Sequence, residues 1–107
     1  MIKGLLEGSI LSLIYKEDIY GYGLLEKLQD GGFEHVSEGT IYPLLLRLQK
    51  EKLITAYFQS SPNSGPNRKY YHITKEGVAA LEDFKAYWVV IEGSVNYFLD
   101  QERVKKN

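Results

Sequence analysis

The stretch from Ser37 to Lys50, SEGTIYPLLLRLQK, decides the fold of this 107-residue chain. Its apolar residues recur at positions i, i+3, i+4 and i+7, the spacing of one helix face: Ile41, Leu44, Leu45 and Leu48. Ser37 is a good N-cap residue, and Pro43 lies early enough in the helix to be tolerated with some distortion. The opposite face is polar, aromatic and partly basic. We therefore expect a helix that packs on a core with one face and turns the other to solvent.

Two further helices are expected before this stretch. The first is amphipathic to largely buried, with apolar residues at helical spacing: Ile2, Leu5, Leu6, Ile10, Leu13 and Ile14. Glu17 and Asp18 mark its end. A shorter helix follows Tyr20-Gly-Tyr-Gly23 and stops at Gly31 and Gly32, because glycine adopts a left-handed C-cap at no cost. A turn then leads into the helix that begins after Ser37.

A β-hairpin and a final helix are expected after it. Residues 54–60 and 68–73 are rich in β-branched and aromatic side chains, and residues 61–67 between them are turn-forming throughout. This pattern predicts a two-stranded hairpin with a long tip. Thr74 can cap the final helix, with Glu76 in its first turn, where the helix dipole favours an acid.

This order of elements, mostly α with one β-hairpin, is that of a winged helix-turn-helix. In that fold the second helix of the pair enters the major groove of DNA, and the hairpin, called the wing, reaches the adjacent DNA backbone. Residues 1–74 would form the DNA-binding domain, and residues 75–107 a C-terminal dimerisation helix of the same compact unit. Side chains of the groove-facing helix and of the hairpin tip are suited to bases and phosphates. The candidates are Ser37, Thr40, Tyr42, Arg47, Lys50, Asn63, Ser64, Asn67, Arg68 and Lys69.

Charge is segregated along the chain. The formal net charge is −1, which alone would argue against a nucleic-acid partner. Residues 47–75, however, hold six basic residues and one acid, a sum of +5, while the rest of the chain sums to −6. Residues 52–75 contain no Asp or Glu, so one face of the domain can approach a polyanion without repulsion. Chance clustering in a short window is the alternative explanation.

The final helix carries the most regular apolar pattern of the chain. A heptad seam alternates spacings of three and four residues: Leu81, Phe84, Trp88, Ile91, Val95 and Phe98. The seam is about 25 Å long at ~1.5 Å per residue, and three short helices and a hairpin cannot easily cover it. We therefore expect a homodimer that forms through this seam. Packing of the seam within one chain is the alternative.

Composition limits the compartment and the partners. The chain has no cysteine, so it forms neither a disulfide nor a thiolate metal site, and a cytoplasmic location is expected. Lys3 and Glu7 interrupt the apolar N-terminal stretch and no small-residue cleavage site follows, which favours a retained helix over a signal peptide. No apolar run approaches the ~20 residues that cross a bilayer, and we expect no membrane partner.

The sequence contains no convincing motif for catalysis or for binding a cofactor. Gly21-Tyr-Gly23 resembles the start of a dinucleotide loop, but Glu26 stands where a glycine is needed and no strand is expected before it. His35 and His72 have no neighbouring metal-ligand pattern, and no catalytic triad or carboxylate pair stands out. We expect no enzyme, no cofactor and no metal. A winged-helix adaptor that binds protein instead of DNA is the alternative function.

Several segments in this order resemble the PadR family of bacterial regulators: Tyr20-Gly-Tyr22, Ser37-Glu-Gly-Thr-Ile-Tyr-Pro-Leu44, Leu45-Leu-Arg-Leu48 and Arg68-Lys-Tyr-Tyr-His-Ile-Thr74 with Glu76-Gly77. The resemblance covers roughly residues 3–90. It implies a long C-terminal helix that swaps contacts with the partner's N-terminal helix, as in the short subgroup, which adds Leu5 to the dimer interface. It also places Tyr42 on the DNA-reading helix, and Arg68 and Lys69 on the wing. Tyr42 could equally pack against the hairpin.

The same resemblance implies a ligand-responsive repressor. Members of the family release their promoters when an aromatic or other planar small molecule binds, in the short subgroup often near a tryptophan at the dimer interface. Trp88 is the only tryptophan and lies on the seam, so two copies could flank a flat apolar slot in a symmetric dimer. Tyr15 and Tyr87 are further candidates for this slot. The alternative is that Trp88 is only a core residue.

Overall fold

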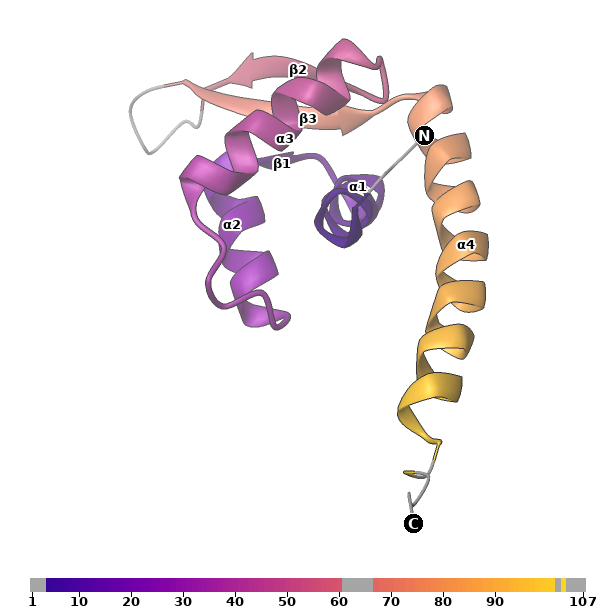
Figure 1. The fold of residues 1–107 in the computed structure, drawn as a ribbon. Coiled ribbons are helices and arrows are strands. Elements are labelled where there is room, and N and C mark those ends of the chain that lie inside the picture. Colours follow the sequence, from indigo (N-terminus) through magenta and orange to yellow (C-terminus); the bar gives the residue numbers. More distant parts are fainter. Residues whose placement is uncertain (1–3, 61–66, 102, 104–107) are drawn as a thin grey trace.

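The computed structural model describes residues 4–60, 67–101 and 103. In this part of the chain, three helices with one short strand among them are followed by a β-hairpin and a long final helix (Figure 1). The elements are α1 (Leu5–Lys16), β1 (Ile19–Tyr20), α2 (Gly21–Asp30), α3 (Glu38–Lys50), β2 (Ile54–Gln59), β3 (Arg68–Ile73) and α4 (Lys75–Leu99). The predicted fold, mostly α with a β-hairpin, is confirmed.

Both predicted N-caps lie at helix starts, but only one makes the capping hydrogen bond. Ser37 precedes α3 in an extended conformation, and its hydroxyl faces Thr40 Oγ1 at 3.5 Å instead of a backbone N–H. Thr74 precedes α4, and its Oγ1 accepts a hydrogen bond of 2.9 Å from the backbone N–H of Gly77. The same hydroxyl donates to the carbonyl of Lys52 at 2.7 Å, which ties the start of α4 to the turn after α3.

The sheet has one strand more than the sequence predicted. The expected hairpin is present, with β2 and β3 antiparallel from the Ile54–Ile73 pair to the Gln59–Arg68 pair. The short strand β1 pairs with the other edge of β3, which gives the order β1-β3-β2. A segment of two residues is too short to show a period in the sequence, so the prediction of two strands was wrong on this point.

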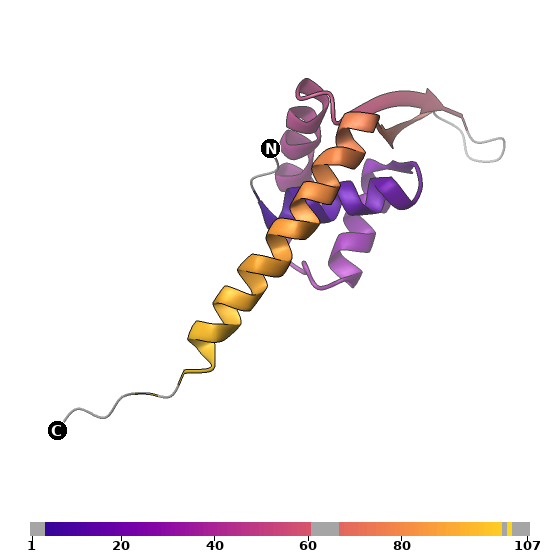
Figure 2. The same cartoon turned by 90° about the vertical axis from the view of Figure 1, so that its right-hand side faces the viewer.

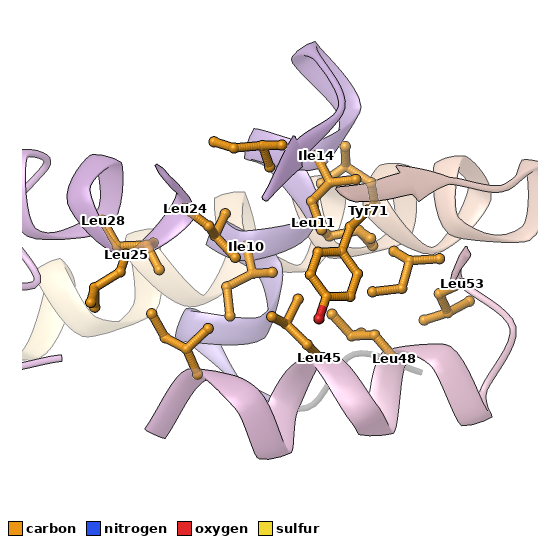
Figure 3. Close-up of a cluster of buried hydrophobic side chains, with 14 residues drawn as sticks. Ile10, Leu11, Ile14, Leu24, Leu25, Leu28, Leu45, Leu48, Leu53 and Tyr71 are labelled. Carbon is orange, nitrogen blue, oxygen red and sulfur yellow. The ribbon is translucent and has the colours of Figure 1, made fainter. Parts of the chain in front are cut away.

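The core surrounds α1, which lies below the sheet and between α2 and α4 in Figure 1, and its buried side chains are drawn in Figure 3. The predicted apolar face of α3 supplies Ile41, Leu45 and Leu48, all at most 1% exposed. They meet side chains of α1, α2 and β3, among them Leu11, Leu24 and Tyr71. Because this face of α3 is buried, its opposite face is fixed toward solvent.

The helix α4 packs on the domain only over its first turns and then extends away from it (Figure 2). Leu81, which the sequence predicts at a dimer interface, is 1% exposed and belongs to the core of its own chain. Phe84 is half-buried, and its ring packs so closely on Gly8 of α1 that a side chain there would overlap it. The first two residues of the predicted seam, Leu81 and Phe84, therefore pack within their own chain, unlike the part of the seam after Phe84.

Beyond Phe84 the seam is largely uncovered in a single protomer: Trp88, Val95 and Phe98 are exposed and Ile91 is half-buried. Large apolar side chains remain exposed along this half of α4: Tyr87, Trp88, Val89, Val90, Val95, Tyr97, Phe98 and Leu99. Leu5 of α1 is also exposed. Over the described residues, no helix combines the length and apolar character that a membrane span requires.

We predict that Gly77→Ala destabilises the protein by about 1–3 kcal/mol, because the added methyl group would overlap the carbonyl oxygen of Leu53 and the side chain of Ile73. The matched control is Gly93→Ala in the same helix, where a Cβ meets nothing within 4 Å. The control should be neutral or stabilising by up to about 1 kcal/mol. Urea unfolding measures both variants, and equal effects would contradict the close packing at Gly77.

Candidate nucleic-acid interface

The exposed face of α3 forms the first part of the candidate interface. Tyr42 is 45% exposed and Leu46 is 55% exposed, although both belong to a helix whose other face is in the core. Gly39, Pro43 and Lys50 are exposed on the same side. Ser37 and Thr40, predicted to bind DNA, are exposed at the N-terminus of α3, where backbone N–H groups favour an anion.

An open hollow of about 420 Å³ lies beside this face of α3. Its lining joins the start of α2, the exposed side of α3 and the start of β3: Tyr20, Gly21, Tyr22, Tyr42, Arg68, Lys69 and Tyr71. This lining holds two cations, four phenol groups and no carboxylate. The hollow is therefore suited to an anion that accepts hydrogen bonds, such as a phosphate.

Close packing fixes Tyr42 at the rim of the hollow. Its hydroxyl lies so near Gly21, the first residue of α2, that a Cβ there would be 2.7 Å from it. Tyr42 therefore packs on the first turn of α2 and, with Tyr71 of β3, lines the hollow. Burial, with a smaller contribution from Tyr42, raises the pKa of Tyr71 above its ordinary value of 10.0. Its hydroxyl thus stays protonated and can donate.

Arg68 and Lys69 begin β3 and are both exposed. The Arg68 guanidinium lies 4.6 Å from the centroid of the Tyr20 ring, and Lys69 Nζ lies 5.8 Å from that of Tyr71. These rings hold the two cations at the hollow by cation–π contact. Within the described residues neither cation forms an ion pair, which leaves their charges available to a phosphate.

Arg47, another predicted DNA-binding residue, already has a partner in its own chain. Its Nη1 lies 2.8 Å from Oε1 of Glu7 in α1. The Glu7 side chain is only 6% exposed, whereas the Arg47 side chain is 55% exposed. A buried carboxylate without a counter-charge is costly, so Arg47 stabilises the packing of α3 beside α1.

Two of the predicted wing residues, Asn63 and Ser64, lie outside the described residues. Asn67 is described and is exposed directly before β3. Lys50 is exposed at the end of α3, one helix length away from Ser37. The structure thus brings Tyr42, Arg68 and Lys69 together at the hollow, whereas the remaining described candidates do not line it.

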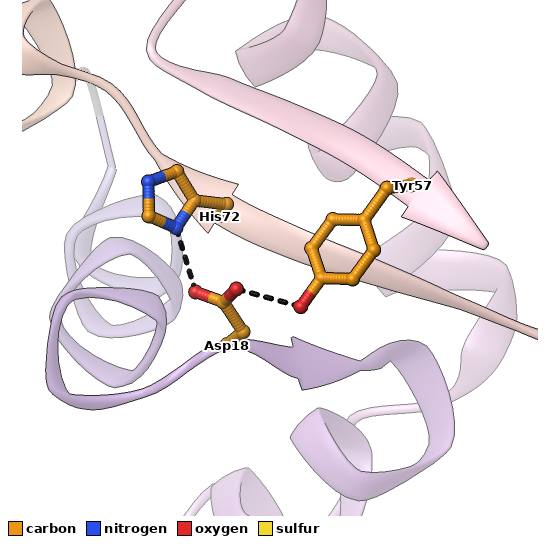
Figure 4. Close-up of polar contacts among 3 residues, drawn as sticks. All are labelled: Asp18, Tyr57 and His72. Atoms are coloured by element: carbon orange, nitrogen blue, oxygen red, sulfur yellow. Dashed lines mark hydrogen bonds and ion pairs between the residues drawn. The ribbon is translucent and has the colours of Figure 1, made fainter. Parts of the chain in front are cut away.

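A polar cluster that the sequence did not reveal holds the sheet against the end of α1 (Figure 4). Asp18 accepts a hydrogen bond of 2.6 Å from the Tyr57 hydroxyl through Oδ2, and its Oδ1 lies 2.7 Å from His72 Nδ1. Burial raises the pKa of Asp18, but the hydrogen bonds from Tyr57 and His72 and the charge of His72 outweigh it, and the pKa lies below its ordinary value. The hydrogen bond to Asp18 conversely raises the pKa of Tyr57. The only signal in the sequence was polar residues on both strands, too common to single out a contact.

The three predicted effector residues lie around the exposed part of α4. Trp88 is 36% exposed, and Tyr15 and Tyr87 are more exposed. Lys85 Nζ lies 5.7 Å from the centroid of the Tyr15 ring, which places Tyr15 beside α4. A separate hollow of about 320 Å³ between α1, α2 and α4 includes Leu28, Phe33 and Phe84 but none of these three residues. Neither this hollow nor the one beside α3 is lined by Trp88, Tyr15 or Tyr87.

Comparison with known proteins gives a consistent result. Residues 10–83 match the PadR-like family of transcriptional regulators. The chain is similar to a PadR-like transcriptional regulator of Bacillus cereus, with 54% identity, a TM-score of 0.84 and coverage of 95% of this chain and 98% of the other. It is also similar to a PadR family regulator of Clostridium difficile, with 36% identity, a TM-score of 0.81 and coverage of 90% and 99%. An uncharacterized protein of Lysinibacillus sphaericus is 32% identical, over 94% of this chain and 93% of its own length.

The fold and the cationic, tyrosine-lined face define a winged-helix transcription regulator of the DNA-binding class. The chain belongs to the PadR-like family of transcriptional regulators, and it is not an enzyme.

We predict that Arg47→Ala lowers the free energy of unfolding by about 1–3 kcal/mol, because it leaves the buried Glu7 carboxylate without its partner. Adding Glu7→Gln should recover part of this loss, since the neutral amide is less costly to bury. Lys50→Ala, at the exposed end of the same helix, is the matched control and should change stability by less than about 0.5 kcal/mol. If urea unfolding gives Arg47→Ala and Lys50→Ala the same small effect, the structural role of Arg47 is refuted.

Proposed function

We propose that this protein is a ligand-responsive repressor that binds an inverted-repeat operator as a homodimer. The observation that carries the DNA-binding part is the hollow at which Tyr42 of α3 meets Arg68 and Lys69 of β3. In winged helix-turn-helix proteins the second helix of the motif enters the major groove. The wing then lies over the neighbouring backbone, where its cations meet phosphates.

In that arrangement, each part of this surface contacts the DNA or positions the residues that do. The hollow takes a backbone phosphate, to which Arg68 and Lys69 supply charge and the tyrosine hydroxyls supply hydrogen bonds. Ser37 and Thr40 lie at the N-terminus of α3, where a second phosphate is favoured. Asn67 and Lys50 extend the contact to the residue before β3 and to the end of α3, and Asn63 and Ser64, outside the described residues, are proposed to contribute as well. Arg47 contributes through the position of α3 that its ion pair with Glu7 stabilises.

Dimerisation is supported by the uncovered half of α4. Trp88, Val95 and Phe98 are exposed, and Ile91 is half-buried, along one side of a helix that extends away from its domain. Apolar side chains at heptad spacing favour a second helix, and a second copy of α4 with Leu5 of its α1 supplies one. A two-fold axis through this seam places two copies of α3 in successive major grooves, ~34 Å apart, on an inverted repeat.

The response to a ligand rests on Trp88. In a two-fold dimer the two Trp88 side chains lie on the shared seam, with Tyr15 and Tyr87 nearby. Flat apolar surfaces of this kind bind planar aromatic compounds. A compound between the two α4 helices would change their packing and thereby the separation of the two α3 helices. The affinity for an operator of fixed spacing would then fall.

We predict that Arg68→Ala combined with Lys69→Ala lowers duplex affinity at least about tenfold, because charge-assisted phosphate contacts are lost, while the dimer persists. The charge-matched control is Lys16→Ala with Lys27→Ala, neither of which lines the hollow. Electrophoretic mobility shift with genomic fragments measures binding. Unchanged binding by the wing variant would favour the alternative function, an adaptor that docks a protein on the same surface.

We predict that Val95→Glu with Phe98→Glu yields a folded monomer, because both side chains are exposed in the protomer and only the partner covers them. Val90→Glu is the control, since this exposed residue lies about 200° around the helix from Trp88 at ~100° per residue. Sedimentation velocity gives the assembly state and circular dichroism the fold. A wild-type monomer at micromolar concentration, or equal disruption by Val90→Glu, would contradict the seam.

We predict that planar aromatic compounds quench the fluorescence of Trp88 saturably in the wild-type dimer and release it from duplex DNA. The monomeric Val95→Glu, Phe98→Glu variant is the control, because it retains Trp88 but lacks the facing copy. Fluorescence titration with a chemically varied panel tests the slot. A panel without any saturable response would leave Trp88 as a packing residue only.

A further inference from the structure

The middle of the exposed face of α3 is apolar. Leu46 is 55% exposed, four residues after Tyr42 and therefore on the same side of the helix. Pro43 is exposed beside it. Leu46 is not needed by the core, which takes Ile41, Leu45 and Leu48 from the other face. An exposed leucine alone is unremarkable in proteins, but this one lies at the centre of the face that a winged helix turns to the major groove.

The polar side chains of α3 lie elsewhere, and Glu38 is the exposed first residue of the helix. Ser37 and Thr40 are at its N-terminal end, where their hydroxyls face each other at 3.5 Å. The Arg47 guanidinium is paired with Glu7 at 2.8 Å. Gln49 is half-buried, and Lys50 is the last residue of the helix. Between Tyr42 and Arg47 the helix therefore has no side chain that can donate or accept a hydrogen bond.

This distribution limits which bases the middle of α3 can distinguish. On the major-groove edges, guanine, cytosine and adenine are told apart by hydrogen-bond donors and acceptors, whereas thymine adds an apolar C5-methyl group. A leucine and a proline offer nothing to the polar groups and can bury only the methyl group. The adjacent cations Arg68 and Lys69 complement phosphates, which favours duplex DNA over protein as the occupant of this apolar face.

We propose that Leu46, supported by Pro43, is a specificity-determining residue that reads a thymine in each operator half-site through contact with its C5-methyl group. This inference rests on the proposed DNA-binding function and adds the chemistry of the base that is read. Burying one methyl group in such a contact is equivalent to about a fourfold change in affinity. Two half-sites would together give about fifteenfold, if their contributions are independent.

The experiment first selects binding sites for the full-length wild-type protein from a randomised 30-base-pair duplex library. The enriched duplex is then synthesised with uracil in place of thymine, one symmetric pair of positions at a time. Uracil lacks only the methyl group and keeps every hydrogen bond. At one symmetric pair we expect affinity to fall about fifteenfold, while uracil at other positions serves as the matched control.

Two variants connect this loss to the side chain. Leu46→Ala is expected to fold normally because the residue is exposed, to retain phosphate-driven binding, and to show less than about a twofold difference between thymine and uracil at that pair. Leu46→Met, which keeps an apolar side chain of similar length, should retain the preference for thymine.

The outcomes separate this inference from the DNA-binding function. An enriched duplex that binds equally well with uracil at every position would overturn the role of Leu46 while leaving DNA binding intact. A preference for thymine that persists in Leu46→Ala would overturn it as well. Failure of any duplex to be enriched would overturn both the inference and DNA recognition itself.

Discussion

Burial of Ile41, Leu45 and Leu48 in the core shared with α1, α2 and β3 determines what the protein presents to solvent. A helix has one orientation in which all three side chains are buried, and that orientation exposes Tyr42 and Leu46. The ion pair between Arg47 and the buried Glu7 adds a polar contact that is satisfied only when α3 lies at this position beside α1. The face that we propose to bind DNA is thus a consequence of how the core is filled.

The position of the sheet is likewise fixed by contacts between residues that are distant in sequence. β1 pairs with β3, and Asp18 binds Tyr57 and His72, so the end of α1 is joined to both strands of the hairpin. Tyr42 packs on Gly21 at the start of α2, and Tyr42, Arg68 and Lys69 line one hollow. The exposed face of α3 and the start of β3 are consequently parts of one surface. The exposed half of α4 is the part of the protomer that lacks such support.

Local patterns in the sequence were sufficient to predict the fold but not the contacts of every side chain. Residue spacing located the helices, the hairpin and the buried face of α3, because periodicity reports which face is apolar. It did not find β1, whose two residues show no period, and it placed Leu81 at an interface although Leu81 is buried in the core of its own chain. The pairing of Arg47 with Glu7 and the cluster around Asp18 join residues about 40 or more positions apart. Which partner a charged side chain meets depends on tertiary packing, and no spacing rule contains that information.

The central claim is that a dimer binds duplex DNA through cations and hydroxyl groups that meet phosphates. It is tested most directly by the salt dependence of affinity for a selected duplex, because each neutralised phosphate releases counterions. If each protomer neutralises about four phosphates, the logarithm of the association constant should fall with the logarithm of salt concentration at a slope near −7. A slope indistinguishable from zero would contradict the account.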